Sequence, residues 1–189
     1  MLARWRRGAV ATITTVFQGD PYEVHVKLRP HVQQFLETLS KTYEIFIFTT
    51  AKQDYAEKVW DVLDSKKKLI RLVKPCWGPL LCWRLVPMGS ASPSRHCLSQ
   101  QHCLCARGYY WKDLTCLGRD LAKTVALDHT IQGFSTQAAN WIPVPRWWGD
   151  PQDEELLRLT PLLGQLSWLD DVRTEIQHRF PHLKLPTED

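Results

Sequence analysis

The pattern of apolar and polar positions predicts an α/β domain that begins with a β-hairpin. Residues 11–17 are rich in β-branched side chains, residues 22–28 alternate between apolar and polar, and a turn-forming stretch separates them. Two further apolar runs, at 43–48 and 124–127, predict buried strands of a sheet. Between and after them lie four stripes with helical spacing: Val32, Phe35, Leu36 and Leu39; Tyr55, Val59, Val62 and Leu63; Leu156, Leu159, Leu163 and Leu166; and Val172 with Ile176. Such strand–helix alternation indicates a chiefly parallel sheet.

Proline and aspartate mark the expected starts of two helices. Pro30 suits the first turn of the helix that follows the hairpin. Pro151 suits the first turn of the leucine-rich helix, with Asp150 as its cap. Pro161 lies inside the leucine-rich stripe, where a proline removes a backbone hydrogen bond, and we expect it to kink that helix.

Composition divides the chain into an atypical N-terminus at 1–10, a domain at 11–180 and a tail at 181–189. The domain is interrupted at about 72–94 by a stretch rich in Pro, Gly, Ser and Trp, which has neither helical nor strand period. Such a stretch is long for a loop inside a compact domain, so we interpret it as an irregular insertion.

Charge is distributed unevenly, although the net charge of +4 is mild. No acidic residue occurs from Ser65 to Lys112, while lysines and arginines accumulate there. This basic stretch is either a solvated loop or a surface that attracts an anionic partner such as a phosphopeptide. We expect no direct contact with nucleic acid. No apolar stretch approaches the ~20 residues that a transmembrane segment needs.

The first 19 residues carry three arginines and no acidic residue, a composition shared by mitochondrial presequences. The strand-like run at 11–17 favours the hairpin instead, because an amphipathic helix would require a different period. The presequence is therefore kept as an alternative.

Three polar side chains follow or adjoin the predicted sheet. Thr49 comes directly after the run at 43–48, Asp128 directly after the run at 124–127, and Lys112 lies in an aromatic segment between them. A hydroxyl, an ammonium and a carboxylate at strand ends can hold a phosphoryl group and a divalent cation. Each also has an ordinary alternative: a turn residue, a solvated surface lysine and a helix cap, respectively. No two aspartates in the chain stand at positions i and i+2.

Six segments, taken together, carry a resemblance to a known family. They are Lys27-Leu28-Arg29-Pro30-His31-Val32, Phe48-Thr49-Thr50-Ala51, Lys112-Asp113-Leu114, Leu117-Gly118-Arg119-Asp120-Leu121, Leu127-Asp128 and Asn140-Trp141-Ile142-Pro143-Val144. Their order and spacing resemble the small phosphatases that act on the C-terminal domain of RNA polymerase II, in the haloacid dehalogenase superfamily. The resemblance implies a Rossmann-like, mainly parallel sheet and magnesium-dependent removal of phosphate from phosphoserine or phosphothreonine in a protein.

The resemblance also assigns roles to four residues. It implies that Thr49 hydrogen-bonds the phosphoryl group, that Lys112 pairs with its charge, and that Asp128 belongs to the magnesium site. His129 stands where the family usually has asparagine or aspartate, and its nitrogen donor suits Mg²⁺ poorly.

The family's nucleophile and acid/base are expected to be absent from this chain. In the family an Asp-x-Asp-x-Thr signature ends the first, central strand; its first aspartate attacks phosphorus and its second transfers protons. That signature should stand upstream of the hairpin, where this chain has only residues 1–10. We therefore expect the first central strand to be missing and two neighbouring strands to expose unpaired backbone edges.

Three functional interpretations remain open. The first is a phosphoserine/phosphothreonine phosphatase domain that is inactive or impaired in this chain. The second is a pseudophosphatase that binds a phosphorylated protein or peptide through Thr49 and Lys112. The third is a receptor-like module of the mitochondrial import machinery, which uses a similar domain. The first two place the protein in the nucleus or cytoplasm, and the third in the mitochondrion.

Overall fold

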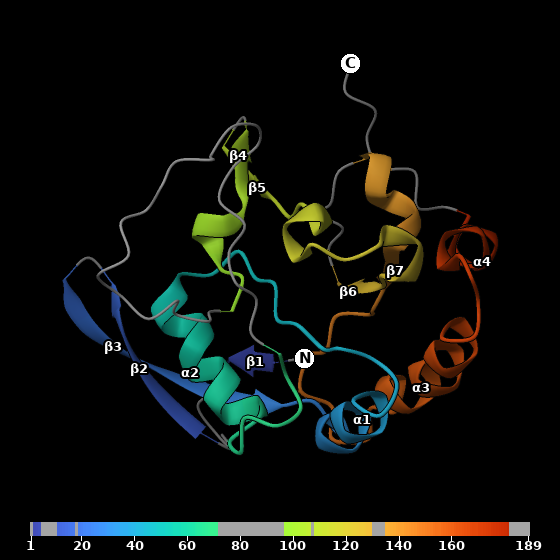
Figure 1. Ribbon diagram of the computed structural model, residues 1–189. Coiled ribbons are helices and arrows are strands. Elements are labelled where there is room, and N and C mark those ends of the chain that lie inside the picture. The colour runs from blue at the N-terminus through green and yellow to red at the C-terminus, as the bar shows by residue number, and fades with distance from the viewer. Residues whose placement is uncertain are drawn as a thin grey trace.

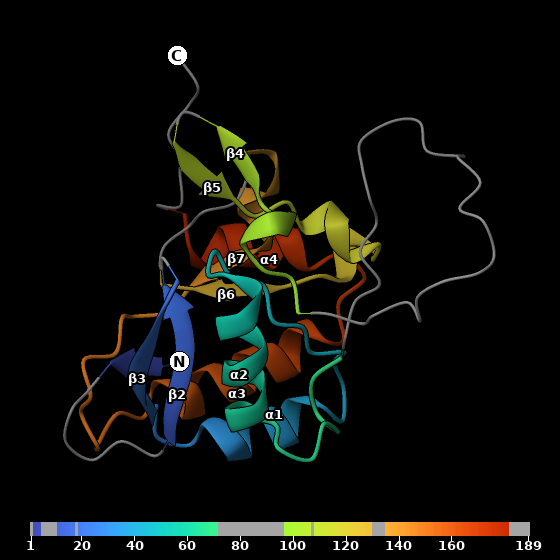
Figure 2. The ribbon, with the colours of Figure 1, turned by 90° about the vertical axis from the view of Figure 1, so that its left-hand side faces the viewer.

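The predicted N-terminal hairpin is present and gains a third strand. In the computed structural model, β2 (Ala11–Phe17) pairs antiparallel with β3 (Asp20–Leu28), and β1 (Leu2–Arg4) pairs with the other edge of β3. The turn uses Gly19 at φ 95°, a conformation that favours glycine. The sheet lies at one edge of the molecule beside α2 (Gln53–Leu63), opposite α3 (Glu155–Leu166) and α4 (Val172–Arg179) (Figures 1 and 2).

The structure describes residues 2–4, 11–17, 19–71, 97–106, 108–129 and 135–181. Most of the predicted N-terminal segment, the whole insertion at 72–94 and all but the first residue of the tail lie outside these ranges. The domain boundaries inferred from composition therefore stay predictions.

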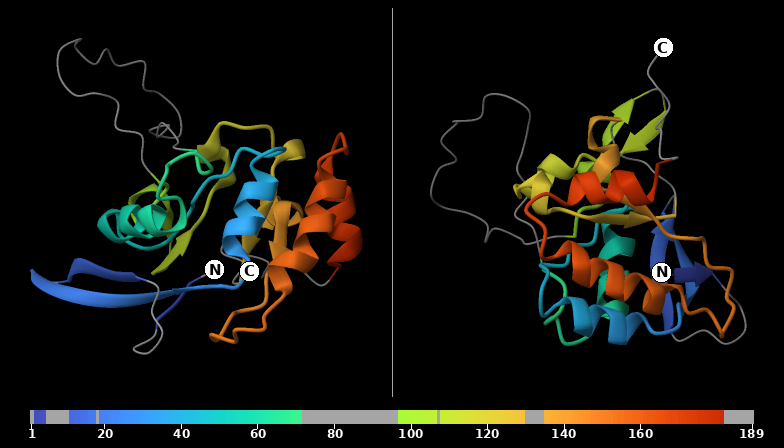
Figure 3. Two further views of the ribbon diagram at one scale, coloured as in Figure 1. Left: turned by 90° about the horizontal axis from the view of Figure 1, so that it is seen from below. Right: turned by 90° about the vertical axis from the view of Figure 1, so that its right-hand side faces the viewer.

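The four predicted helices are present, and they bury the predicted stripes. They are α1 (Val32–Leu39), α2, α3 (Glu155–Leu166) and α4 (Val172–Arg179). Helices α1 and α3 pack side by side (Figures 1 and 3). Their leucines form the main core together with apolar side chains of β3 and α2.

Two helices begin later than predicted. Helix α1 begins at Val32, after His31 in the left-handed region at φ 62°, so Pro30 lies before the first turn. Helix α3 begins at Glu155 and not at Pro151, because Asp150 caps a short turn by accepting a hydrogen bond from the backbone N of Gln152 at 2.9 Å. Pro161 lies within α3, and its expected kink stays a prediction.

Parallel pairing is present at three places in the described chain. Strand β6 (Ala126–Asp128) pairs with β7 (Trp141–Pro143), and isolated parallel bridges join Ile45 to Ile70 and Phe48 to Leu98. The α/β fold class with a mainly parallel sheet and an N-terminal hairpin is thus confirmed. The run at 43–48, however, forms only those two bridges in place of the regular, buried strand predicted, and it is half-buried.

The remaining elements form short connections around this sheet. A second antiparallel pair joins β4 (Leu104–Ala106) to β5 (Tyr109–Trp111). Four 3₁₀-helices complete the described chain: η1 (Gln100–His102), η2 (Leu114–Leu117), η3 (Leu121–Lys123) and η4 (Ser135–Asn140). A smaller apolar cluster, made by Leu98, Leu114, Leu117 and Trp141, lies beside β5 and β7.

Asp64, buried at the end of α2, holds the turn that leads into the Ile45–Ile70 bridge. Its carboxylate accepts hydrogen bonds from the backbone N atoms of Lys68, Leu69 and Ile70 at 3.1, 2.7 and 2.8 Å. Burial raises the pKa of this carboxyl, but the backbone N–H groups together outweigh it, and the pKa is lowered.

Replacing Asp64 by alanine is expected to lower the free energy of unfolding by about 1–3 kcal/mol, because three backbone donors lose their acceptor. Urea denaturation followed by circular dichroism measures the change. Asp61→Ala is the matched control: it removes an exposed carboxylate of the same helix, paired with Lys67 at 3.2 Å, and should change stability by less than about 1 kcal/mol. Equal effects of the two substitutions would contradict the role assigned to Asp64.

Candidate functional site

Lys112 and Asp128 form a buried ion pair at one end of β6. Lys112 directly follows β5 and its side chain is 9% exposed, while Asp128 ends β6 and is 12% exposed. The Nζ atom of Lys112 donates a hydrogen bond to Oδ2 of Asp128 and lies 5.9 Å from the centroid of the Trp141 ring. An ammonium has three N–H donors, so this bond leaves donor capacity for another anion. The structure thus brings two of the predicted site residues together.

The second oxygen of Asp128 faces His129. Oδ1 accepts a hydrogen bond from the backbone N of His129 at 2.7 Å and lies 3.0 Å from Nδ1 of the imidazole. The imidazole itself is half-exposed. Both carboxylate oxygens of Asp128 therefore have partners within the protein.

The described residues do not form a complete magnesium site. Mg²⁺ requires a near-octahedral shell of oxygen ligands, and the described part of the chain contains no group of three or more His, Cys, Asp or Glu side chains placed to hold a metal ion. Asp128 offers one carboxylate that is already paired, and His129 offers a nitrogen. A divalent cation at Asp128 would need further oxygen ligands, from a bound phosphate or from carboxylates outside the described residues.

Thr49 lies in a turn that follows the Phe48–Leu98 bridge. Its backbone N donates to the carbonyl of Leu98 at 2.9 Å, and its Oγ1 accepts a hydrogen bond from the backbone N of Ala51 at 3.1 Å. Thr49 therefore does act as a turn residue, the alternative considered for it from the sequence. It uses one acceptor position of the hydroxyl, and the O–H group can still donate to a phosphoryl oxygen.

Cys103 lies beside Thr49 and was not predicted as a site residue. Its thiol lies 3.7 Å from the backbone O of Thr49. Burial raises the pKa of this thiol to about 11, although the nearby ammonium of Lys112 acts in the opposite direction. Because the thiol is protonated at neutral pH, Cys103 is not a ready nucleophile.

Buried amide side chains fix the loops on either side of the ion pair. Gln137 accepts from the backbone N of Leu114 at 2.9 Å and donates to Asp113 at 2.7 Å, which holds the loop that follows Lys112. Asn140 donates to the carbonyls of Leu121 and Thr124 at 2.6 and 2.7 Å, which holds the entry into β6. Asn140 belongs to a segment that carried the family resemblance, and its role here is to position β6.

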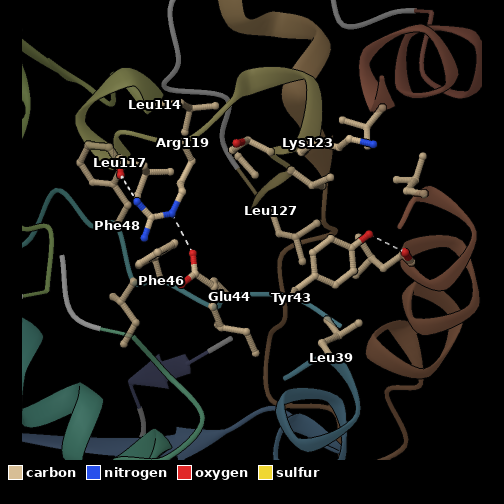
Figure 4. A pocket seen from close by; sticks show the side chains of 18 of the residues that line it. Leu39, Tyr43, Glu44, Phe46, Phe48, Leu114, Leu117, Arg119, Lys123 and Leu127 are labelled. Atoms are coloured by element: carbon tan, nitrogen blue, oxygen red, sulfur yellow. Dashed lines mark hydrogen bonds and ion pairs between the residues drawn. The ribbon is translucent and has the colours of Figure 1, made fainter. Parts of the chain in front are cut away.

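A cavity of about 580 Å³ begins beside Lys112 and runs between residues 43–48 and residues 124–127. We call it the inter-strand cavity. Figure 4 shows Phe46 and Phe48 on one side of it and Leu127 on the other, with Leu114 and Leu117 at one end and Tyr43 and Leu39 at the opposite end. The ion pair of Arg119 with Glu44, at 2.7 Å, lies at its wall.

Comparison with known proteins identifies the family. A model of the NLI interacting factor-like phosphatases matches residues 4–76 and 87–173. The intervening residues lie inside the predicted insertion. The chain is 39% identical over 173 residues to the CTD small phosphatase-like protein 3 of Caenorhabditis elegans, covering 91% of this chain and 52% of the relative. It is 31% identical to the CTD nuclear envelope phosphatase 1 of Xenopus laevis, covering 89% and 61%.

A solved structure agrees with the fold. The fission yeast RNA polymerase II CTD phosphatase Fcp1, bound to beryllium fluoride, superposes with a TM-score of 0.50 at 18% identity, over 95% of this chain and 50% of that one. The chain thus spans about half the length of the proteins it matches. None of these relatives is a mitochondrial import protein, so the mitochondrial alternative has no support among them. No helix in the described part of the chain is both long and apolar enough to span a membrane.

The segments that carried the resemblance thus lie within the matched regions, and the fold agrees with that of a phosphatase of the same type. The chain therefore belongs to the family of NLI interacting factor-like phosphatases, the haloacid dehalogenase-type phosphatases that include the small C-terminal-domain phosphatases.

Proposed function

We propose that this chain is a phosphoserine/phosphothreonine phosphatase domain that binds a phosphorylated protein or peptide and does not hydrolyse it with its own residues. The observation that carries the proposal is the buried ammonium of Lys112, held by Asp128 at the end of a strand in a parallel pair. A buried cation with remaining donor capacity is a natural partner for a phosphoryl group. Family membership supports the substrate class, because the relatives named above are phosphatases.

In this proposal Lys112 pairs with the phosphoryl charge and the O–H of Thr49 donates to a phosphoryl oxygen. Cys103 lies beside Thr49, and its thiol is neutral because burial raises its pKa to about 11. The substrate is a phosphorylated segment such as the RNA polymerase II C-terminal domain, and the location is nuclear or cytoplasmic. The names of the relatives support both choices.

Hydrolysis would require groups that the chain does not supply at this site. Phosphoryl transfer in this family uses one carboxylate as nucleophile and another as acid and base. The two carboxylate oxygens of Asp128 already interact with Lys112 and His129, respectively. In addition, the sequence contains no Asp-x-Asp pair. Mg²⁺ remains an expectation from the family, since Asp128 is a single ligand, and we assign it no step.

A binding measurement tests the proposal. Fluorescence anisotropy with a phosphoserine peptide and its unphosphorylated twin is expected to show weak binding that favours the phosphopeptide and falls steeply with salt. Lys112→Ala should lower affinity for the phosphopeptide by about ten- to hundredfold, because a hydrogen bond to a charged group contributes about 1.5–3 kcal/mol. Thr49→Val should reduce the preference by less, since a neutral hydroxyl is lost.

Lys58→Ala is the matched control. It removes one positive charge from an exposed pair with Asp54 on α2, so the preference for the phosphopeptide should survive. Circular dichroism verifies that each variant is folded, and Lys112→Gln keeps a polar side chain beside Asp128 if the alanine variant unfolds. Equal affinity of the parent chain for both peptides would refute the proposal and leave only a nonspecific basic surface.

A further inference from the structure

The segment at 43–48 has a backbone edge that faces the inter-strand cavity. The carbonyls of Ile45 and Ile47 accept hydrogen bonds from the backbone N atoms of Arg71 and Leu98, at 2.6 and 3.0 Å. Backbone groups of successive residues in an extended chain point to opposite sides. Those of Glu44, Phe46 and Phe48 therefore point into the cavity, where no backbone hydrogen bond reaches them from the described residues.

Strand β6 presents a second such edge across the cavity. The carbonyl of Asp128 accepts a hydrogen bond from the backbone N of Val144 at 2.8 Å, on the side of β7. By the same alternation the backbone groups of Leu127, the preceding residue, point away from β7 and into the cavity. In the described part of the chain β6 pairs with β7 alone.

The two edges run in the same direction. At their amino ends, the hydroxyl of Tyr43 donates to the carbonyl of Leu163 at 2.6 Å, and Lys123 donates to the carbonyl of Leu169 at 2.6 Å, so both begin near the end of α3. Toward their carboxyl ends, Phe48 and Ala126 both pack against the smaller cluster of Leu98, Leu114, Leu117 and Trp141. An extended chain lying between them would be parallel to both.

Burial indicates that the described residues cover these two edges incompletely. Strands inside a parallel sheet are normally buried on both faces. The apolar side chains along the cavity are nevertheless only partly buried, although each packs against a core cluster: Ile45, Ile47, Val125 and Leu127 against the larger one, and Phe46, Phe48 and Ala126 against the smaller one. The lining is mainly apolar, and its charged side chains are those of Glu44, Lys112, Arg119, Asp120 and Lys123.

We propose that the inter-strand cavity accepts one extended β-strand from another polypeptide, apolar along its length and ending in a carboxylate. Two parallel backbone edges match the hydrogen-bonding pattern of a strand on both of its sides, as in other cases where a peptide is added to a sheet. The carboxyl end of such a strand lies beside the ammonium of Lys112, so an acidic residue there is complementary in charge. The guest strand would join the bridges at 45–70 and 48–98 and the β6–β7 pair into one continuous sheet.

A synthetic strand tests the proposal. The probe is a fluorescein-labelled peptide, Lys-Lys-Thr-Val-Ile-Val-Leu-Asp, amidated at its carboxyl end so that its one carboxylate is the aspartate side chain. It is expected to bind the full chain at least tenfold more tightly than the peptide of reversed sequence. Amide hydrogen exchange should slow at Phe46, Phe48 and Leu127, which face the cavity, and change little at Ile45 and Ile47.

Two N-methylated peptides provide the sharpest control and need no change to the protein. One carries the methyl group on the isoleucine and the other on the following valine, so that each removes a donor from a different side of the strand. Insertion between two edges predicts that both bind at least tenfold more weakly, whereas addition to a single edge predicts that only one does. Exchange of the terminal aspartate for asparagine should weaken binding to the parent chain about fivefold and leave binding to Lys112→Met unchanged.

The possible outcomes separate the alternatives. Equal binding of the parent and methylated peptides would overturn the proposal in favour of apolar adhesion. Absence of binding would overturn it in favour of a cavity closed by this chain itself, or by a second copy if sedimentation shows a dimer. Both proposals place an anion beside Lys112, but their tests are separate: failure of the strand peptide to bind leaves the measured preference for a phosphopeptide unaffected, and the converse also holds.

Discussion

Replacing Asp153 by alanine is expected to lower the free energy of unfolding by about 3–5 kcal/mol, the cost of leaving a buried charge without its partner. The partner is Arg29, which is 2% exposed. Its Nε and Nη2 atoms donate to the two oxygens of Asp153 at 2.6 and 2.8 Å, and its Nη1 atom donates to the carbonyl of Pro145 at 2.9 Å. This bidentate pair connects the segment before α1 with the segment before α3. In the alanine variant the guanidinium of Arg29 would keep only one of these acceptors, the carbonyl of Pro145.

Chemical denaturation of the parent and variant measures this change. Glu175→Ala is a suitable control, because it removes a carboxylate from an exposed pair with Arg179 at a similar distance of 2.6 Å and should cost less than about 1 kcal/mol. The double substitution Arg29→Met with Asp153→Leu should recover much of the loss, since apolar residues need no partner. A loss below about 1 kcal/mol for Asp153→Ala alone would show that water satisfies Arg29.

The same pair predicts how stability depends on pH. The hydrogen bond from Arg29 lowers the pKa of the Asp153 carboxyl below its usual value. A carboxyl with a lowered pKa in the folded state stabilises the fold fully above the pKa of the unfolded chain, about 3.9, and the contribution disappears as the pH falls through the lower folded value. The stability difference between the parent and Asp153→Ala should therefore be constant above about pH 5 and shrink below about pH 4.

The purified chain is expected to show no magnesium-dependent hydrolysis of p-nitrophenyl phosphate above the uncatalysed background. General acid–base assistance alone accounts for about 100- to 10,000-fold in rate, and the covalent route is lost as well when no nucleophile is available. The groups at the proposed site do not replace it: Asp128 is paired on both oxygens, and burial raises the pKa of the Cys103 thiol to about 11.

Fluorine NMR with beryllofluoride supplies a second measurement, because a competent aspartate would trap a stable mimic of its phosphoryl adduct. We expect no such signal. The informative control is Asp128→Ala purified in parallel. Activity that persisted through repeated purification of the parent and vanished in this variant would overturn the proposed lack of turnover. It would also show that Asp128 is required for hydrolysis.

Local periodicity predicted the helices and the hairpin because those patterns depend on few distant partners. Val32, Phe35, Leu36 and Leu39 recur with helical spacing, and all four are buried in α1. The start of α3 could not be predicted in this way. Asp150 and Pro151 carry an appropriate cap signal, but Asp153 lies just ahead of the helix because Arg29, 124 residues away, takes its carboxylate.

Tertiary contacts also explain what remained unpredicted in the sheet and the site. The run at 43–48 has the composition of a buried strand, yet among the described residues it is paired on one side alone, and only through isolated bridges to Ile70 and Leu98. The sequence placed Lys112 and Asp128 in one site through their positions at or near predicted strand ends and through family resemblance. Their direct pairing depends on loops fixed by Gln137 and Asn140, and the thiol of Cys103 contacts Thr49 from 54 residues away, so no local signal exists for either contact.

If a strand from another polypeptide binds the backbone edges along the inter-strand cavity, the free energy of unfolding of this chain depends on the concentration of that polypeptide. A ligand that binds the folded form alone adds about 2.7 kcal/mol of stability when it is present at a hundred times its dissociation constant. Small domains are marginally stable, so an increment of this size changes the unfolded fraction roughly a hundredfold. The steady-state amount of this protein in a cell would then follow the supply of the polypeptide that donates the strand, without any change in the rate at which the chain itself is synthesised.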